Sequence, residues 1–162
     1  MTEVLLSLGS NIEPQRHLDL ALIELREHFP GLQASHYYRT AAVGFEGDDF
    51  LNAAARIDTE MPPIELNAWL HALEDRHGRR RDGPRFSSRT LDIDIVYYGD
   101  QVLDGPQNLQ IPRDEIRHAF VLGPLAEIAP DFVDPKRGIS LQAMWQQHPA
   151  FGSLLPMAAC SA

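Results

Sequence analysis

The alternation of apolar runs and turn residues divides most of the chain into short strands and helices. Strands are expected over residues 4–8, 32–38, 50–57 and 91–98. One helix is expected from Pro14 to Phe29, because apolar residues recur there at helical spacing before Pro30-Gly31. A second helix is expected from the Pro62-Pro63 pair to Gly78, where glycine ends the periodic pattern.

Beyond Pro112 the pattern weakens. Helical turns are expected over 113–122 and 124–129, and a short helix over 139–147. From about residue 149 the tail is weakly patterned, and we expect it to be disordered. The element order β-α-β-β-α-β predicts an α+β fold, a ferredoxin-like α/β sandwich in which helices pack on an antiparallel sheet. No linker or repeat interrupts it, so a single domain over residues 1–162 is expected.

Composition narrows the class of protein. The chain has 162 residues, 44% hydrophobic and 23% charged, which excludes a disordered tail, a collagen-like chain and a coiled coil. Its one cysteine, Cys160, excludes an internal disulfide. The net charge of −9 argues against general binding to nucleic acid or an anionic membrane. The first residues lack the pattern of a signal peptide, so we expect a cytoplasmic protein, monomeric and acting on small molecules.

Positive charge is concentrated in one segment of this acidic chain. Six of the 14 cationic residues lie between Arg76 and Arg89, with Asp82 the only acid inside that window. Such a cluster indicates binding of a small, strongly anionic ligand, because guanidinium groups pair with phosphate in two-pronged fashion. The alternative is a solvated charged loop without a ligand.

Two carboxylates follow this segment on the clearest strand. Asp92 and Asp94 are two residues apart, so both point to one face while Leu91, Ile93 and Ile95 point to the other. Side-by-side carboxylates repel unless a cation lies between them, and magnesium fits that need. Acids for a metal beside arginines for phosphate indicate phosphoryl transfer. The alternative is a strand with two incidental acids on its wet face.

Several blocks resemble one family when taken together. They are Leu8-Gly9-Ser10-Asn11, Tyr38-Arg39-Thr40, Phe50-Leu51-Asn52-Ala53-Ala54, Arg89-Thr90-Leu91-Asp92-Ile93-Asp94-Ile95, Ala119-Phe120-Val121-Leu122, Pro124-Leu125 and Glu127-Ile128-Ala129-Pro130. In order and spacing, over roughly residues 4–135, they resemble the 6-hydroxymethyl-7,8-dihydropterin pyrophosphokinases of the folate pathway. The resemblance implies a ferredoxin-like fold and transfer of pyrophosphate from ATP to the hydroxymethyl oxygen of the pterin, releasing AMP.

The resemblance also implies roles for individual residues. Asp92 and Asp94 would hold two magnesium ions, and Arg79 and Arg89 would approach the phosphates of ATP. Arg81, Glu74 and Ile95 would contact the nucleotide. The pterin would be bordered by Thr40, Ala41 and Val43, hydrogen-bonded by Asn52 and stacked between Phe50 and Phe120. Stacking between aromatic rings and pairing with an amide suit a flat heterocycle, although both phenylalanines could equally be core residues.

The sequence departs from the family pattern in three places. Phe86-Ser87-Ser88 stands where the family often has Trp-Gly-Pro, and Ala41 where proline is common. The segment after Pro112 is one residue shorter than usual and carries Arg113 and His118 where the family has a histidine and an arginine. We expect Arg113 or Arg117 to replace the missing phosphate contact.

Two alternatives to the enzyme remain open. One is a pterin- or nucleotide-binding paralogue with low turnover, which the shortened segment after Pro112 would explain. The other is an RNA-binding module of ferredoxin-like fold, which the negative charge and the missing aromatic-basic motif oppose.

Overall fold

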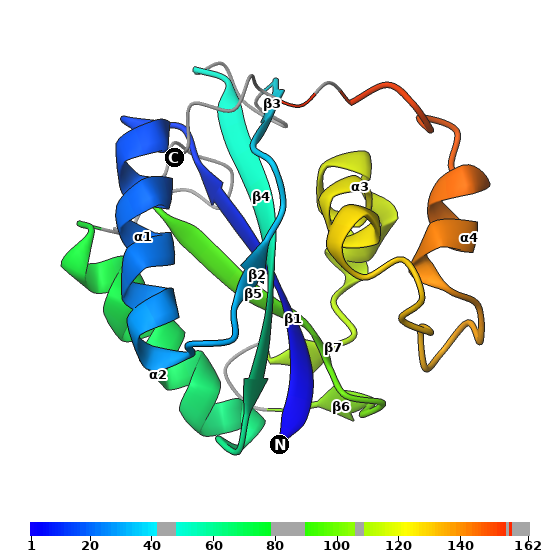
Figure 1. The fold of residues 1–162 in the computed structure, drawn as a ribbon, viewed down its shortest axis with the longest axis horizontal. Coiled ribbons are helices and arrows are strands. Elements are labelled where there is room, and N and C mark those ends of the chain that lie inside the picture. The colour runs from blue at the N-terminus through cyan, green and yellow to red at the C-terminus, as the bar shows by residue number, and fades with distance from the viewer. Residues whose placement is uncertain (42–47, 79–89, 106–108, 155, 157–162) are drawn as a thin grey trace.

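An antiparallel sheet forms the centre of the protein, with helices on both of its faces (Figure 1). The computed structural model describes residues 1–41, 48–78, 90–105, 109–154 and 156. The strands are β1 (Thr2–Ser10), β2 (Gln33–Ala34), β3 (Tyr38–Thr40), β4 (Phe50–Thr59), β5 (Asp92–Tyr98), β6 (Leu103–Asp104) and β7 (Gln110–Ile111). The helices are α1 (Pro14–His28), α2 (Pro63–Arg76), α3 (Ala119–Ile128) and α4 (Leu141–Gln146), with a 3₁₀ turn, η1, over Asp114–Arg117.

The main sheet has the strand order β2-β4-β1-β5, and β3 also pairs with β4. All of these pairings are antiparallel. The order and the β-α-β-β-α-β sequence of elements confirm the predicted α+β fold. In the described part of the sheet β5 is an outer strand. Two of its backbone groups are bonded outside the sheet: Ile93 N donates to Glu74 Oε2 at 2.6 Å, and Val96 O accepts from Arg113 N at 3.1 Å.

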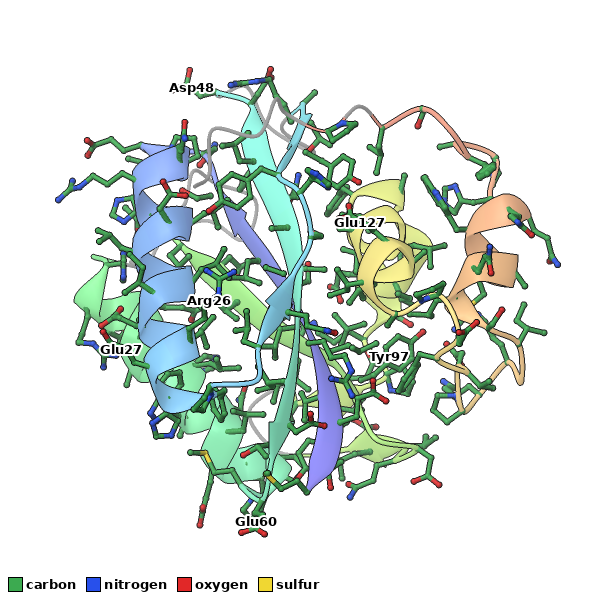
Figure 2. All side chains as sticks on the ribbon, in the orientation of Figure 1. Arg26, Glu27, Asp48, Glu60, Tyr97 and Glu127 are labelled. Carbon is green, nitrogen blue, oxygen red and sulfur yellow. The ribbon has the colours of Figure 1, made fainter. Side chains whose placement is uncertain are left out.

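Alternating side chains give the sheet two buried faces. One face packs against α1 and α2, and its buried residues include Leu6, Leu8 and Ile93. The other packs against α3 and α4 and includes Leu5 and Tyr97. Figure 2 shows Tyr97 on this second side, where its hydroxyl donates to Asp134 Oδ2 at 2.6 Å. Asp92 and Asp94 alternate with Ile93 and Ile95 and therefore lie on the α3 side of the sheet.

The expected strand over 32–38 is wrong as a single element. The segment forms β2, then a gap over residues 35–37, and only its last residue, Tyr38, belongs to β3. The Ser35 hydroxyl accepts from Ala54 N at 2.8 Å, while Ser35 N donates to Ala54 O at 2.9 Å. The side chain thus takes one bond that a strand would make through its backbone, and the ladder is interrupted there.

The C-terminal part is more ordered than the sequence predicted. Instead of two turns at 113–122 and 124–129, it forms η1 and the continuous helix α3, which includes Pro124. Burial of Val121, Leu122 and Leu125 against the sheet holds the helix together although proline lacks a backbone donor. The expected helix over 139–147 is confirmed as α4, with Ser140 as its side-chain cap.

The expectation of disorder from about residue 149 is wrong for residues 149–154 and 156, which the structure describes. Leu154 lies against Gly123 of α3, and Pro156 forms a bridge with Tyr38. Phe151 packs edge-on against Trp145 of α4, with ring centroids 5.6 Å apart. Apolar contacts with the helices therefore fix the start of the tail. Within the described residues, no helix is long and apolar enough to cross a membrane.

Candidate active site

A row of three residues crosses the sheet at the end of β1. Gly9 pairs with Asn52 of β4 on one side and with Asp92 of β5 on the other. Adjacent strands are about 4.8 Å apart, so the amide and the carboxylate start roughly 10 Å from each other with a glycine between them. The register therefore joins the residue expected to bind the pterin to one expected to hold magnesium.

Because Gly9 has no side chain, it leaves the surface of the sheet between the Asn52 and Asp92 side chains uncovered. A Cβ at this position would lie 3.3 Å from Asn52 Oδ1 and 3.8 Å from Phe50 Cδ1. The first of these distances is closer than ordinary van der Waals contact, so a larger residue would push the Asn52 amide aside. Sequence reasoning noted Gly9 only as part of a family motif and gave it no role in the site. No local signal in the sequence indicates this role, because it depends on the register of β1 with β4 and β5.

The carboxylate pair is confirmed on one face of β5, where Asp92 and Asp94 are both half-buried. Between them, the backbone N–H of Ile93 donates to Glu74 Oε2 at 2.6 Å. Glu74 lies near the end of α2 and is 1% exposed. The helix thus fixes the strand directly between the two aspartates.

Among the described residues, Asp94 has acidic neighbours and the cation Arg113 near it. Burial, followed by the neighbouring Asp92 carboxylate, raises the pKa of Asp94 to about 8, and Glu74 and Glu115 add to the effect. Arg113 opposes this rise, with its Nη1 3.8 Å from Asp94 Oδ1. The raised pKa means that the ionised form of Asp94 is disfavoured here, and a bound cation would favour it.

The pair fits magnesium. Within the described residues no group of three or more His, Cys, Asp or Glu side chains is arranged to hold a metal, so this part of the chain offers the two carboxylates. Magnesium commonly takes one or two carboxylates and completes its octahedron with water and phosphate oxygens. The carboxylate oxygens of Asp92 and Asp94, on one face of β5, suit it.

On the pterin side, the structure brings Asn52 and Thr40 together. Asn52 is 5% exposed and donates from Nδ2 to Thr40 Oγ1 at 2.6 Å, which orients its amide. Phe50 is half-buried at the start of β4, and Ala41 is exposed next to β3. Asn52, Thr40 and Phe50 therefore lie at the start of β4 and on its partner strand β3, and their contact with a pterin stays a prediction.

Phe120 lies at the start of α3 and is half-buried against the core on the α3 side of the sheet. Its ring stacks on His118, with centroids 5.0 Å apart and planes 10° from parallel. Burial lowers the pKa of His118, and the neighbouring Arg117 lowers it further. At neutral pH His118 is therefore an uncharged aromatic partner of Phe120.

Two of the expected site residues, Ile95 and Arg117, do not face the row Asn52–Gly9–Asp92. The side chain of Ile95 is in the core with α1 and α2, and the residue is 1% exposed. Arg117 points into solvent, 64% exposed, with Nη1 3.9 Å from Asp114. Arg79, Arg81, Arg89 and Val43 lie outside the described residues.

A separate open cavity of about 700 Å³ lies at the beginning of α1. Asn11, Arg16, Arg39 and Asp48 are among its lining residues. It contains none of the residues expected to bind pterin, nucleotide or metal, so the candidate site is defined by the row across the sheet instead.

Paired carboxylates with a guanidinium beside them, held on rigid strands, are the arrangement of enzymes that transfer phosphate-containing groups. Comparison with known proteins gives the same class. The family model for 7,8-dihydro-6-hydroxymethylpterin-pyrophosphokinase (HPPK) matches residues 5–130. The chain belongs to the HPPK family and is a pyrophosphokinase.

Similar proteins include three named 2-amino-4-hydroxy-6-hydroxymethyldihydropteridine pyrophosphokinase. That of Methylorubrum extorquens is 42% identical over 139 residues, covering 82% of this chain and 86% of the relative. The Synechocystis relative is 37% identical and covers 86% and 73%, and the Pseudomonas aeruginosa relative is 38% identical and covers 79% and 81%.

Among solved structures, Plasmodium falciparum HPPK-DHPS A437G with SDX-DHP aligns with a TM-score of 0.68. The two chains are 12% identical, and the alignment covers 90% of this chain and 45% of that one. This chain thus spans less than half the length of the Plasmodium chain. At this identity the likeness supports the fold alone.

Proposed function

We propose that this pyrophosphokinase transfers the pyrophosphoryl group of ATP to the hydroxymethyl oxygen of 6-hydroxymethyl-7,8-dihydropterin, releasing AMP, as a step in folate biosynthesis. The observation that carries the proposal is the row Asn52–Gly9–Asp92 across three strands. A pterin held by the amide would direct its substituent over the glycine toward the carboxylates. The oxygen attacks the β-phosphorus as the bond to the α-phosphate oxygen breaks.

Asp92 and Asp94 are proposed to hold two magnesium ions, as the family resemblance implies. Their shared face on β5 supports this assignment, as does the raised pKa of Asp94, since a bound cation would favour its ionised form. When bound, magnesium stabilises the charge that develops on the phosphate oxygens during transfer. Glu74 helps to hold the pair in position, because its carboxyl accepts a hydrogen bond from the backbone N–H of Ile93, between the two aspartates.

Asn52 is proposed to pair with the donor and acceptor edge of the pterin, since a carboxamide both donates and accepts. Its bond to Thr40 supports this role by holding the amide in one orientation. Phe50 and Phe120 are proposed to stack on the ring, and Thr40, Ala41 and Val43 to border it. The stack of His118 on Phe120 supports an aromatic platform at this place.

Arginines are proposed to bind the triphosphate. Arg113 is the one whose contacts support this, because its guanidinium lies beside Asp94, whereas Arg117 points into solvent. Arg79, Arg81 and Arg89 remain proposals from the resemblance, and the buried position of Ile95 leaves it without a direct contact to propose. We further propose a monomer that works in the cytoplasm, where ATP is supplied.

The test is incubation of the protein with ATP, magnesium and 6-hydroxymethyl-7,8-dihydropterin, with AMP and pterin pyrophosphate measured by chromatography. We expect stoichiometric AMP, and a fall in turnover of about 100-fold or more in Asp94→Asn, because the amide keeps the shape but loses the charge. Tight pterin binding without AMP would contradict the enzyme and favour the low-turnover paralogue.

A further inference from the structure

Two hydrogen bonds, made to groups other than Asp94, hold Arg113 next to that residue. Its backbone N donates to Val96 O at 3.1 Å, which ties it to β5 two residues beyond Asp94. Its Nε donates to Glu115 Oε2 at 3.1 Å. The remaining end of the guanidinium, Nη1, lies 3.8 Å from Asp94 Oδ1.

This places a positive charge beside a carboxylate that is proposed to hold a metal ion. The Arg113 side chain is 24% exposed and that of Asp94 is 30% exposed, so water screens the pair only in part. A guanidinium and a divalent cation repel each other, and Asp94 cannot be fully paired with both. Binding of a metal by Asp94 therefore requires that Arg113 give up this carboxylate.

We propose that Arg113 competes with the metal for Asp94. In the metal-free protein Arg113 pairs with Asp94, and an incoming cation displaces it from that carboxylate. The guanidinium then binds the phosphates of the nucleotide. The inference rests on the proposed function, which supplies the metal at Asp94 and the triphosphate. The hydrogen bonds to Val96 and Glu115 keep Arg113 within reach of both positions.

The competition predicts effects of opposite sign from one substitution. Arg113→Gln removes the repelling charge, so at a pH high enough to ionise Asp94 in both proteins the variant alone should bind the metal more tightly. The same change removes a charged donor from the triphosphate, so the complex with nucleotide should weaken. A residue that only supports the fold would weaken both or neither.

The experiment titrates the nucleotide-free protein with Mn²⁺ and follows free Mn²⁺ by electron paramagnetic resonance. Arg113→Gln should lower the Kd for Mn²⁺ at least about fivefold, even if the repulsion is close to its weak limit in water. Arg113→Lys keeps the charge and should stay near wild type. Arg26→Gln, which removes an exposed charge on α1, is the matched control and should change nothing.

A second titration uses a non-hydrolysable ATP analogue with magnesium, measured by calorimetry. Here Arg113→Gln should raise the Kd about tenfold or more, as expected for a lost charge-assisted hydrogen bond. Thermal melts confirm that each variant is folded, and Arg113→Met serves as a second uncharged variant.

Unchanged or weaker Mn²⁺ binding in folded Arg113→Gln and Arg113→Met, with Asp94→Asn still losing Mn²⁺, overturns the competition and leaves the proposed function standing. Equal Mn²⁺ binding in wild type and Asp94→Asn overturns both, because the metal then lies elsewhere. Tighter Mn²⁺ binding combined with weaker binding of the nucleotide supports the inference.

Discussion

The buried carboxyl of Glu74 gives the sharpest test of how the site is built. It receives the Ile93 N–H at 2.6 Å and is 1% exposed at the end of α2. Glu74→Ala would leave that donor without its carboxyl partner between the two aspartates. Glu74→Gln would keep an acceptor oxygen at nearly the same place.

The expected loss of stability follows from these contacts. A buried donor left unpaired costs about 1–3 kcal/mol, and the lost methylene about 0.8 kcal/mol. Relief of the repulsion between Glu74 and Asp94, together with the better helix propensity of alanine, offsets part of this, by about 1 kcal/mol. We therefore expect Glu74→Ala to lower the free energy of unfolding by about 1–3 kcal/mol and Glu74→Gln by less than about 1 kcal/mol.

The assay is equilibrium unfolding in urea with the metal-free protein, followed by circular dichroism. Glu27→Ala is the control, since Glu27 is exposed on α1 and should stay within about 0.5 kcal/mol of wild type. If Glu74→Ala behaves like this control, the carboxyl does not hold β5 and the reasoning fails. Equal losses in the Ala and Gln variants would show that charge, rather than an acceptor at Ile93, is what matters.

Three further predictions follow from the pKa shifts and from Asn52. Because the pKa of Asp94 is raised to about 8, its contribution to stability is present at low pH and is lost as pH rises from about 4 to 8. Metal-free Asp94→Asn should thus melt above wild type at pH 8.5, by a margin that shrinks toward pH 4.5. Burial, and then His77, lowers the pKa of His17 from 6.5, so its contribution is lost as pH falls below about 6.5. His17→Gln should accordingly lose less melting temperature than wild type between pH 7.5 and 5, and an equal loss would contradict this. Asn52→Ala should weaken pterin binding about tenfold or more by calorimetry while leaving binding of the ATP analogue within about twofold, and equal losses for both ligands would indicate a misfolded sheet.

The local pattern of apolar and polar residues was sufficient to predict the carboxylate pair and the main strands and helices. Alternation of Asp92 and Asp94 with Ile93 and Ile95 fixes which side chains face the core, because strand periodicity is a local property. The same holds for α1 and α2, whose ends are marked by proline and glycine in the sequence.

Long-range register was not predictable in this way. Nothing near Gly9 in the sequence indicates that Asn52 and Asp92 will pair with it from opposite sides. The antiparallel pairing of β6 with β7 was missed because two-residue strands carry no alternation. The break at Ser35 depends on a side-chain bond to Ala54, and the continuity of α3 through Pro124 depends on tertiary burial.

The two bonds that β5 makes outside the sheet also bear on solubility. An outer strand with unpaired backbone groups is a template for another chain, and aggregation through such edges is common. Here Glu74 covers the Ile93 donor and Arg113 N covers the Val96 acceptor, so part of that edge is already closed. Glu74 and Arg113, which lie at the site, thus also reduce the number of unpaired backbone groups through which two chains could associate. Glu74→Ala should therefore raise the insoluble fraction on expression beyond what its stability loss alone explains.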